Sequence, residues 1–497
     1  MEKKILILIL ILAAYLRLND ISGYMTFLGD EGRDVLVVKR MIVDHKFTLL
    51  GPTASVGGFF LGPIYYYLMA PFLWLWRMDP TGPAVMVALF GIATVYLVYR
   101  FGKELFGSAA GISAALLYAI SPLVIAYSRS SWNPNLVPFF STALVYCLYK
   151  TAVKNQWNLL FVIGVIIGIG MQLHYLFSLL FIVAVIWFWI YGKSKTHIRH
   201  YIYGAIGFAV GYAPFLLFEV RHSFPNTTSI VQFLLSGKET GFSILEFIQI
   251  IRDVSFRLFG RLLFRLPQPE LWGTFPQWQQ AVWWLATRGL LVLSLVLLVR
   301  QRKRQESVLL LIWLVVVIVL LGFYRRGIYD YYFGIFFALP FLLLGWVLSE
   351  FWKKSRTKWI AAVLFIVIAI VNWEGRPFKF PPNNQLAQMR KIAEVAYAKT
   401  DGKPFNFALV APLNSDHAYR YFFEIWGNIP VTIENAAKDP QRRTVTDQLI
   451  VICEIPNCQP LGNPLWEIAG FGRAEISGVW EVPFVTIYKL THYQEQR

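Results

Sequence analysis

Long apolar runs separated by small basic clusters constrain this chain more than any other sequence feature. The chain has 497 residues, of which 57% are hydrophobic and 15% are charged, and its mean hydropathy is +0.51. Apolar runs of this length are what bilayer spans require, and a soluble globular protein of this size carries more charge. We therefore predict an α-helical polytopic membrane protein.

The net charge of +17 does not indicate a nucleic-acid partner, because the Lys and Arg residues gather into no single patch or stripe. They form small clusters between the apolar runs instead. Lys and Arg favour cytoplasmic loops, so we interpret each cluster as cytoplasmic. The clusters are Lys3/Lys4, Arg100/Lys103, Lys150/Lys154, Lys193/Lys195/Arg199, Arg300/Arg302/Lys303/Arg304 and Lys353/Lys354/Arg356/Lys358.

These clusters predict about eleven spans of a plasma-membrane protein, with a cytoplasmic N-terminus and an external C-terminus. The apolar segment 63–76 does not fit, because a crossing there would reverse every later loop. Its roughly 14 residues are short for a span and its Tyr and Trp residues suit the interface, so we predict a re-entrant or juxtamembrane helix. The predicted spans are 4–18, 82–100, 107–127, 133–150, 157–172, 175–191, 201–218, 281–300, 307–323, 331–350 and 359–373.

A long loop, 219–280, is predicted on the external side. Its segment 242–266 mixes arginines with apolar residues, a pattern typical of an amphipathic helix on a lipid surface. The arginines are Arg252, Arg257, Arg261 and Arg265.

The composition turns polar after residue 373, which predicts two domains: a transmembrane domain, 1–373, and an external soluble domain, 374–497. Patterns in the second domain indicate an α/β fold. Cys453 and Cys458 lie close together there, and a disulfide and two free thiols both remain open. The predicted elements are a strand at 405–411, a helix at 415–426 and strands at 430–434 and 448–454.

The first external loop, 19–61, carries the sharpest chemical signal. Asp30 and Glu31 are adjacent carboxylates, and with Arg33 they open a predicted amphipathic helix that runs to about His45. A carboxylate at a membrane surface can act as a general base. Acidic residues in a first helical turn are also expected from the helix dipole alone, so a structural and a catalytic role both remain open.

Three other external turns hold candidate residues for a substrate cavity. Arg129 and Asn135 lie in the second turn, although Asn and Pro there also fit an ordinary helix start. His174 lies in the third, where a lone His is more often an interfacial hydrogen-bonding residue than a metal ligand.

The fourth turn, 323–332, places Arg325 and Arg326 among tyrosines that include Tyr324 and Tyr329. The planar guanidinium fork binds phosphate oxygens bidentately, so this pair suits a donor phosphate. Ordinary contacts of arginines with lipid headgroups are the alternative.

Several motifs occur in an order that resembles the membrane glycosyltransferases of the C fold. They are GDEGRD at 29–34, GPIYYYL at 62–68, YRFGKELFG at 99–107 and SPLVIAYSRSSWNPNLVPFF at 121–140. Within that class the chain is most similar to the branch that holds protein O-mannosyltransferases and the lipid A aminoarabinose transferase. The resemblance covers about 1–373 and is strongest over 28–140.

This resemblance implies transfer from a dolichyl- or undecaprenyl-phosphate sugar outside the cytoplasm. It implies that Asp30 lies at the acceptor hydroxyl and Arg33 near the donor phosphate. The chain departs from the pattern at Asn135, where many relatives carry an acidic residue. Leu61 and Gly62 stand where the aminoarabinose branch has an acidic metal ligand, so a divalent metal is possible but not supported, and no metal ligand is assigned.

We therefore predict an inverting glycosyltransferase, either hexosyl or pentosyl. Its donor would bind in a cavity between the first external loop and the 324–332 turn. Asp30 would be the general base, supported by Glu31, and Arg33, Arg325 and Arg326 would bind the phosphate. The acceptor, which could be protein, lipid or glycan, is not identified by the sequence.

A polytopic transporter or a flippase for lipid-linked glycans is the alternative, since either would also be apolar and basic inside. Transporters usually carry internal repeats and ionisable groups near mid-bilayer. Here the polar groups gather at the predicted external surface, which favours the enzyme. An en bloc oligosaccharide transferase would usually have a second acidic residue at position 135.

Overall fold

The computed structural model describes residues 1–192, 197–236 and 242–494. Lys193 and Lys195 of one predicted basic cluster, and 237–241 of the predicted 219–280 loop, lie outside the described residues. The chain divides into two compact units. Unit 1 consists of Met1–Ile21, Phe47–Met69 and Ala84–Pro382, and unit 2 consists of Ser22–Lys46, Ala70–Pro83 and Asn383–Arg497.

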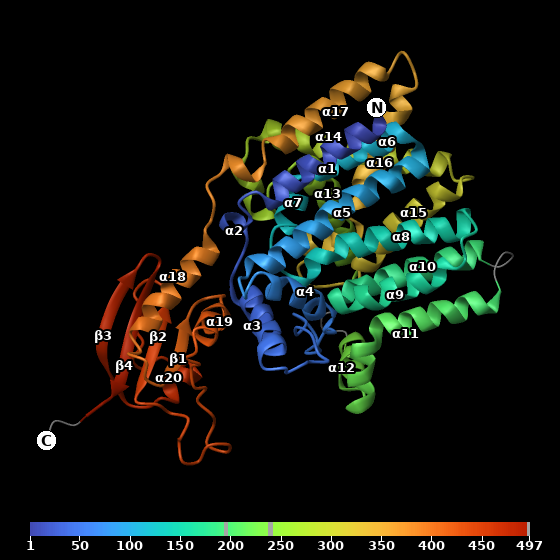
Figure 1. Cartoon of the computed structure of the whole chain (residues 1–497). Helices are drawn as coiled ribbons and strands as arrows, with labels where there is room; N and C mark the ends of the chain where they lie inside the picture. The colour runs from blue at the N-terminus through green and yellow to red at the C-terminus, as the bar shows by residue number, and fades with distance from the viewer. Residues whose placement is uncertain (193–196, 237–241, 495–497) are drawn as a thin grey trace. The chain divides into compact units, whose positions relative to one another are not determined.

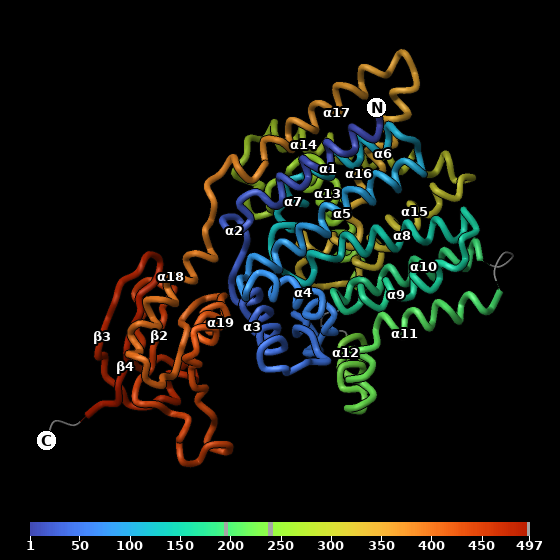
Figure 2. Tube along the Cα trace, viewed as in Figure 1, coloured from blue at the N-terminus to red at the C-terminus, as the bar shows by residue number. Residues whose placement is uncertain are grey.

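Unit 1 is helical, and each predicted span coincides with one helix or with two consecutive helical pieces (Figures 1 and 2). Helices are the expected outcome, because backbone groups in a bilayer must be satisfied within their own segment. Its longer helices are α1 (Glu2–Leu18), α5 (Thr81–Phe106, which begins in unit 2), α6 (Ser108–Ile120), α7 (Pro122–Tyr127), α8 (Val137–Val153), α9 (Leu159–Leu173), α10 (Ser178–Tyr191), α11 (Ile198–Arg221), α12 (Pro225–Ser236), α13 (Ile244–Leu263), α14 (Gln277–Arg300), α15 (Gln305–Leu321), α16 (Ala338–Trp352) and α17 (Lys358–Trp373). The 3-10 helices are η1 (Asn133–Leu136), η2 (Tyr175–Phe177), η3 (Pro269–Thr274), η4 (Asp330–Phe336) and η5 (Pro377–Lys379).

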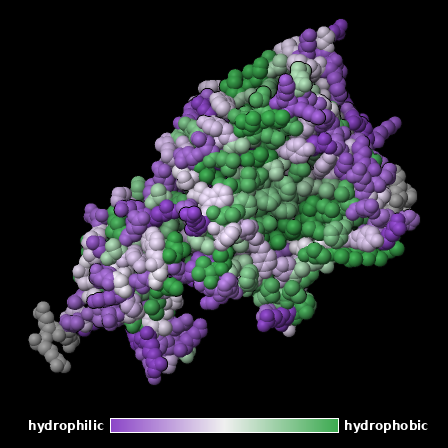
Figure 3. Space-filling view, viewed as in Figure 1, coloured by the Kyte–Doolittle hydropathy of each residue, from purple (hydrophilic) through white to green (hydrophobic). Residues whose placement is uncertain are grey.

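Several of these helices are long and apolar enough to cross a bilayer. In the described part of the chain four helical segments meet this condition, and a fifth does if η4 and α16, bent by 60°, form one span. The four are α5, η1 with α8, α11 and α14. The face of unit 1 seen in Figure 3 is largely hydrophobic over its helices. The chain is therefore a membrane-integral, mostly helical protein.

Helices α9 and α11 pack closely through glycines, and they run side by side in Figure 2. A Cβ at Gly164 would overlap the carbonyl oxygen of Gly204, and one at Gly207 would overlap that of Phe161. Small residues at a helix interface allow backbones this near in a membrane. This contact holds α9, whose last residue precedes His174, against α11.

Unit 2 contains a four-stranded sheet in the order β1-β2-β4-β3 (Figure 1). Strand β1 (Asn406–Val410) pairs in parallel with β2 (Gln448–Cys453), while β4 (Val485–His492) is antiparallel to β2 and to β3 (Ala474–Val482). Every residue of β2 is buried, so both faces of the sheet are covered. Phe407 contacts Tyr419 and Phe423 of α19 (His417–Ile425) on one face. Ala408, Leu449 and Ile468 of α20 (Trp466–Ala469) pack on the other.

The α/β character predicted for 374–497 is present in unit 2, with differences in detail. The segment 430–434 forms only an isolated bridge, between Val431 and Asn406, because its backbone then turns away from β1. The pattern also missed β3, β4 and α18 (Gln385–Ala398). Cys453 and Cys458 form a disulfide.

Unit 2 also includes three short helical segments from the N-terminal part of the chain. Helix α2 (Ile21–Tyr24) begins at the boundary, α3 (Gly29–Val43) lies wholly in unit 2, and α4 (Ile64–Leu75) crosses the boundary. The prediction of a helix opening at Asp30 and ending near His45 matches α3. Helix α3 packs along α19, so the acidic loop and the C-terminal segment form one body.

Candidate functional site

The first turn of α3 is built around a buried glutamate. Glu31 accepts a hydrogen bond from the backbone N–H of Leu28 at 3.0 Å, which satisfies a free donor at the helix start. Its side chain is almost fully buried. Burial raises the pKa of Glu31 from its ordinary 4.5 to about 7, and the neighbouring carboxylates Asp30 and Asp34 add to that effect. Glu31 therefore changes charge near neutral pH.

Asp30, Arg33 and Asp34 form a linked charge cluster over the first two turns of the same helix. Arg33 Nη1 donates to Asp30 Oδ1 at 2.9 Å, while Arg33 Nε and Nη2 donate to Asp34 Oδ1 at 2.9 and 2.8 Å. The Asp34 side chain is fully buried, but that of Asp30 is 55% exposed. The buried carboxylate thus fixes the guanidinium, and the guanidinium holds an exposed carboxylate at the surface.

Residues from the start of α19 complete the surroundings of this turn. Asn414 Oδ1 accepts from the backbone N–H groups of Gly29 at 3.0 Å and Ser415 at 2.9 Å. Asn414 Nδ2 donates to Glu454, as does the hydroxyl of Tyr419 at 2.7 Å. One amide side chain thus anchors both helix starts. Sequence reasoning missed Asn414 because nothing near residue 414 marks a partner 385 residues away.

The predicted phosphate turn of unit 1 is an aromatic cluster with exposed arginines beside it. The hydroxyls of Tyr175, Tyr324 and Tyr332 lie 3.1 to 3.5 Å from one another. Arg325 is partly exposed, and its Nε lies 3.1 Å from Glu246. Arg326 and Tyr329 are also exposed. The turn therefore exposes two guanidinium groups and the phenol of Tyr329, while the hydroxyls of Tyr324 and Tyr332 are buried.

Beneath this turn, Asp330 accepts ion pairs from two arginines of α13. Arg257 Nη1 lies 3.3 Å from Asp330 Oδ1, and Arg261 Nε lies 2.7 Å from Oδ2. Both arginines are nearly buried, and Arg257 also donates to the Ile328 carbonyl at 2.6 Å. The prediction of a helix lying on the lipid surface is therefore wrong for the C-terminal half of α13, which carries Arg257 and Arg261. An amphipathic pattern identifies a polar face but not whether lipid or protein covers the helix.

Three other predicted cavity residues bond to backbone groups. Arg129 is buried and donates to the carbonyls of Leu16, Asn19 and Asp20 at 2.7 to 3.0 Å, which covers the end of α1. Asn135 Nδ2 donates to the Ser130 carbonyl at 2.8 Å.

His174 shows the same structural pattern. Its Nδ1 accepts from the backbone N–H of Leu176 at 3.2 Å, and its ring stacks on Tyr175. Burial lowers the pKa of His174 to about 3, so the ring is neutral near pH 7. Its contacts position the aromatic cluster.

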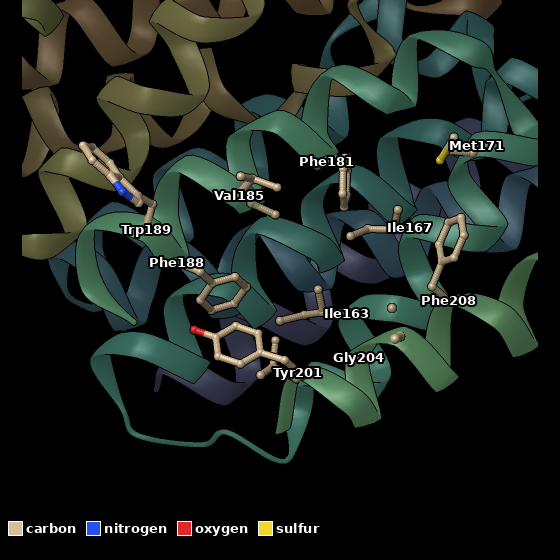
Figure 4. Close-up of a pocket in the computed structure, with 14 residues that line it drawn as sticks. Ile163, Ile167, Met171, Phe181, Val185, Phe188, Trp189, Tyr201, Gly204 and Phe208 are labelled. Atoms are coloured by element: carbon tan, nitrogen blue, oxygen red, sulfur yellow. The ribbon is translucent and has the colours of Figure 1, made fainter. Parts of the chain in front are cut away.

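A hollow of about 720 Å³ opens between α9, α10 and α11 (Figure 4). Its walls are almost wholly apolar and include Ile163, Ile167, Phe181 and Phe208. Such a hollow fits a hydrocarbon chain, and its described lining residues include no carboxylate, histidine, lysine or cysteine.

No three His, Cys, Asp or Glu side chains lie close enough to hold one metal ion, as far as the described residues go. Glu31 is occupied by a backbone donor and Asp34 by Arg33. The described residues of this site therefore do not fit a metal ion, and we derive no step through one.

The architecture defines the class of the protein. The family model described as dolichyl-phosphate-mannose-protein mannosyltransferase matches residues 61–218. ArnT from Cupriavidus metallidurans, solved with undecaprenyl phosphate bound, superposes with a TM-score of 0.60 over 98% of this chain and 97% of ArnT, at 12% identity. The chain therefore has the fold of the C-fold membrane glycosyltransferases, as the sequence resemblance implied.

Three further proteins are similar to this chain, one in structure and two in sequence. An oligosaccharyltransferase from Archaeoglobus fulgidus matches with a TM-score of 0.51 over 90% of this chain and 67% of its own, at 12% identity. YkcB and YycA of Bacillus subtilis, named as proposed mannosyltransferases, are 24% and 23% identical over 205 and 128 residues. These matches cover 39% and 26% of this chain, but only 28% of YkcB and 19% of YycA.

Proposed function

We propose that this protein is an inverting glycosyltransferase that moves a sugar from a polyprenyl-phosphate donor to an acceptor outside the cytoplasm. The C fold supports the proposal, as do the mannosyltransferase family model and the likeness to an ArnT that holds undecaprenyl phosphate. The observation that carries it is the half-exposed carboxylate of Asp30, held by Arg33 in the first turn of α3.

In the proposed reaction Asp30 is the general base. The acceptor oxygen attacks the anomeric carbon while its proton passes to the Asp30 carboxylate. The bond from that carbon to the phosphate oxygen breaks, and its electron pair leaves on the lipid phosphate. A single displacement of this kind inverts the anomeric centre. Glu31 supports the base by capping the turn that carries it.

The phosphate role is proposed for Arg325 and Arg326, since exposed guanidinium forks can bind phosphate oxygens bidentately. Tyr329 supplies an exposed phenol beside them, while the buried Tyr324 supports the turn through Tyr175 and Tyr332. Arg33 was expected to share this role, but its guanidinium lies between two carboxylates of its own helix. We therefore propose that Arg33 orients Asp30 instead.

The proposal includes an orientation in the membrane. We propose eleven spans, a cytoplasmic N-terminus, and an external location for both the first loop and the C-terminal α/β segment. The basic clusters between the apolar helices support this orientation.

The test is donor turnover in lipid nanodiscs, with undecaprenyl-phosphate mannose and undecaprenyl-phosphate aminoarabinose offered as donors. Release of undecaprenyl phosphate is measured by mass spectrometry, with a membrane extract as acceptor. We expect Asp30→Asn to lower the rate about 100- to 10,000-fold, because asparagine cannot take a proton. Asp44→Asn, at the other end of α3, is the matched control and should keep the wild-type rate. A correctly inserted Asp30→Asn variant with near-normal transfer would refute the mechanism.

A further inference from the structure

The start of α19 lies directly against the first turn of α3. A Cβ at Gly29 would overlap the Ser415 hydroxyl, and one at Gly32 would overlap the backbone of Ala418. The backbone carbonyl carbon of His417 would lie 2.8 Å from the same Cβ position of Gly32. Because Gly32 stands between Asp30 and Arg33 in sequence, this contact brings His417 to the edge of the charge cluster.

The His417 side chain is held at one ring nitrogen only. Its Nδ1 lies 2.8 Å from Ser415 Oγ and 3.9 Å from Asp416 Oδ1. Its Nε2 has no hydrogen bond to the described residues, and the side chain is 39% exposed. A serine hydroxyl can accept from Nδ1–H of the neutral ring, which leaves the Nε2 lone pair able to take a proton, and it can accept from the same N–H of the protonated ring, so Ser415 can hold the ring in both states.

We propose that His417, supplied by the C-terminal segment, is the proton relay of the Asp30 base. This inference rests on the proposed function and adds a residue to it. His417 acts through Asp30 and does not bind the donor. The chemical class it serves is a hydroxyl acceptor, whose proton must leave the site after each transfer.

In this relay the proton of the acceptor moves to solvent in three steps. The acceptor O–H bond breaks and its proton reaches the Asp30 carboxylate, while the sugar moves from phosphate to acceptor. The proton then passes from Asp30 to Nε2 of His417, directly or through one water, and the carboxylate is ionised again. His417 finally releases the proton to solvent through its exposed edge.

Burial keeps the His417 ring neutral, which is the state that can accept a proton. Burial lowers the pKa of His417 below its usual range. Asp416 and Asp30 oppose this shift, while Arg33 and Arg420 add to it. The ring is thus neutral at pH 7, and it loses its ability to accept a proton only as the pH falls through that lowered pKa.

The experiment compares pH–rate profiles of kcat in nanodiscs for the wild type and His417→Gln, with the donors named above. We expect kcat at pH 7 to fall about 10- to 100-fold, the lower part of the range for general acid–base residues, with the donor KM unchanged. The acid-side step that belongs to His417 should disappear from the profile. Exogenous imidazole should restore activity to His417→Ala, because it can fill the vacated space and carry the proton.

Controls separate the relay from a purely structural role. His45→Gln, an exposed histidine beyond the other end of α3, should keep both rate and profile. Ser415→Ala keeps the imidazole and should move the acid-side step, so it tests the relay if His417 variants fold poorly. Glu31→Gln should retain the acid-side step of the kcat profile. This result would show that the step does not arise from the titration of Glu31.

The outcomes are distinct for the two proposals. If Asp30→Asn is inactive while His417→Gln keeps the wild-type kcat and profile, the relay is wrong and the glycosyltransferase mechanism stands. A loss of activity in His417→Ala that imidazole does not restore would also overturn the relay. If Asp30→Asn is active, both proposals fall together.

Discussion

Replacing Glu31 by glutamine should remove part of the pH dependence of the free energy of unfolding. The Glu31 side chain is buried, and its pKa is raised from 4.5 to about 7 in the folded protein. The unfolded chain therefore ionises at lower pH than the folded one. Protonated Glu31 costs the folded state no buried charge. Its contribution to the free energy of unfolding is therefore fully present below pH 4.5 and is lost as the pH rises through 7.

The shift sets the size of the effect. A difference from 4.5 to 7 corresponds to about 3 kcal/mol of unfolding free energy lost between pH 4.5 and 8. Glutamine cannot ionise, and its amide oxygen can still accept from the Leu28 N–H. We therefore expect Glu31→Gln to match the wild type near pH 4.5 and to be more stable above pH 7.

Thermal unfolding in detergent, followed by intrinsic fluorescence from pH 4.5 to 8, measures this difference. The Tm of the wild type should fall relative to that of Glu31→Gln as the pH rises. Glu394→Gln, at an exposed glutamate of α18, is the control and should follow the wild-type curve. Parallel curves for Glu31→Gln and the wild type would show that the buried carboxylate does not titrate in this range.

Three further predictions concern the membrane unit and its orientation. Arg325→Ala and Arg326→Ala should each weaken apparent donor affinity about 10- to 100-fold with little change in Tm, since a charge-assisted phosphate contact is stronger than an exposed ion pair; wild-type KM for the donor in both would remove their phosphate role. Arg129→Met should lower the free energy of unfolding by about 1–3 kcal/mol, because buried carbonyls at the end of α1 lose their donor, and an unchanged Tm would contradict this. Cysteines introduced at Met78 and Asn383 should react with an impermeant reagent from outside, and labelling at position 78 only from the cytoplasm would require the later spans to be redrawn.

The sequence by itself determined the helical architecture and the acidic turn. Apolar runs of span length must fold as helices in lipid, so each predicted span coincides with a helical segment. The helix opening at Asp30 was equally predictable, because charge and periodicity are local properties. The order of the motifs from residue 29 to residue 140 also predicted the C fold, which the structure confirms.

Only the tertiary structure decided which of these groups work together. Arg257 and Arg261 form ion pairs with Asp330 beneath the tyrosine turn. The amphipathic pattern of the segment that carries these arginines suited a lipid surface equally well. The Cys453–Cys458 disulfide, left open by the spacing, is likewise a matter of geometry.

The arrangement around Asp30 is the clearest case. His417 reaches the first turn of α3 because glycines let two backbones meet that lie almost 400 residues apart, and Asn414 ties both helix starts together. No local signal encodes such a contact. It arises when two short helices bury their faces against each other, and so the sequence could indicate the base while only the fold supplied its neighbours.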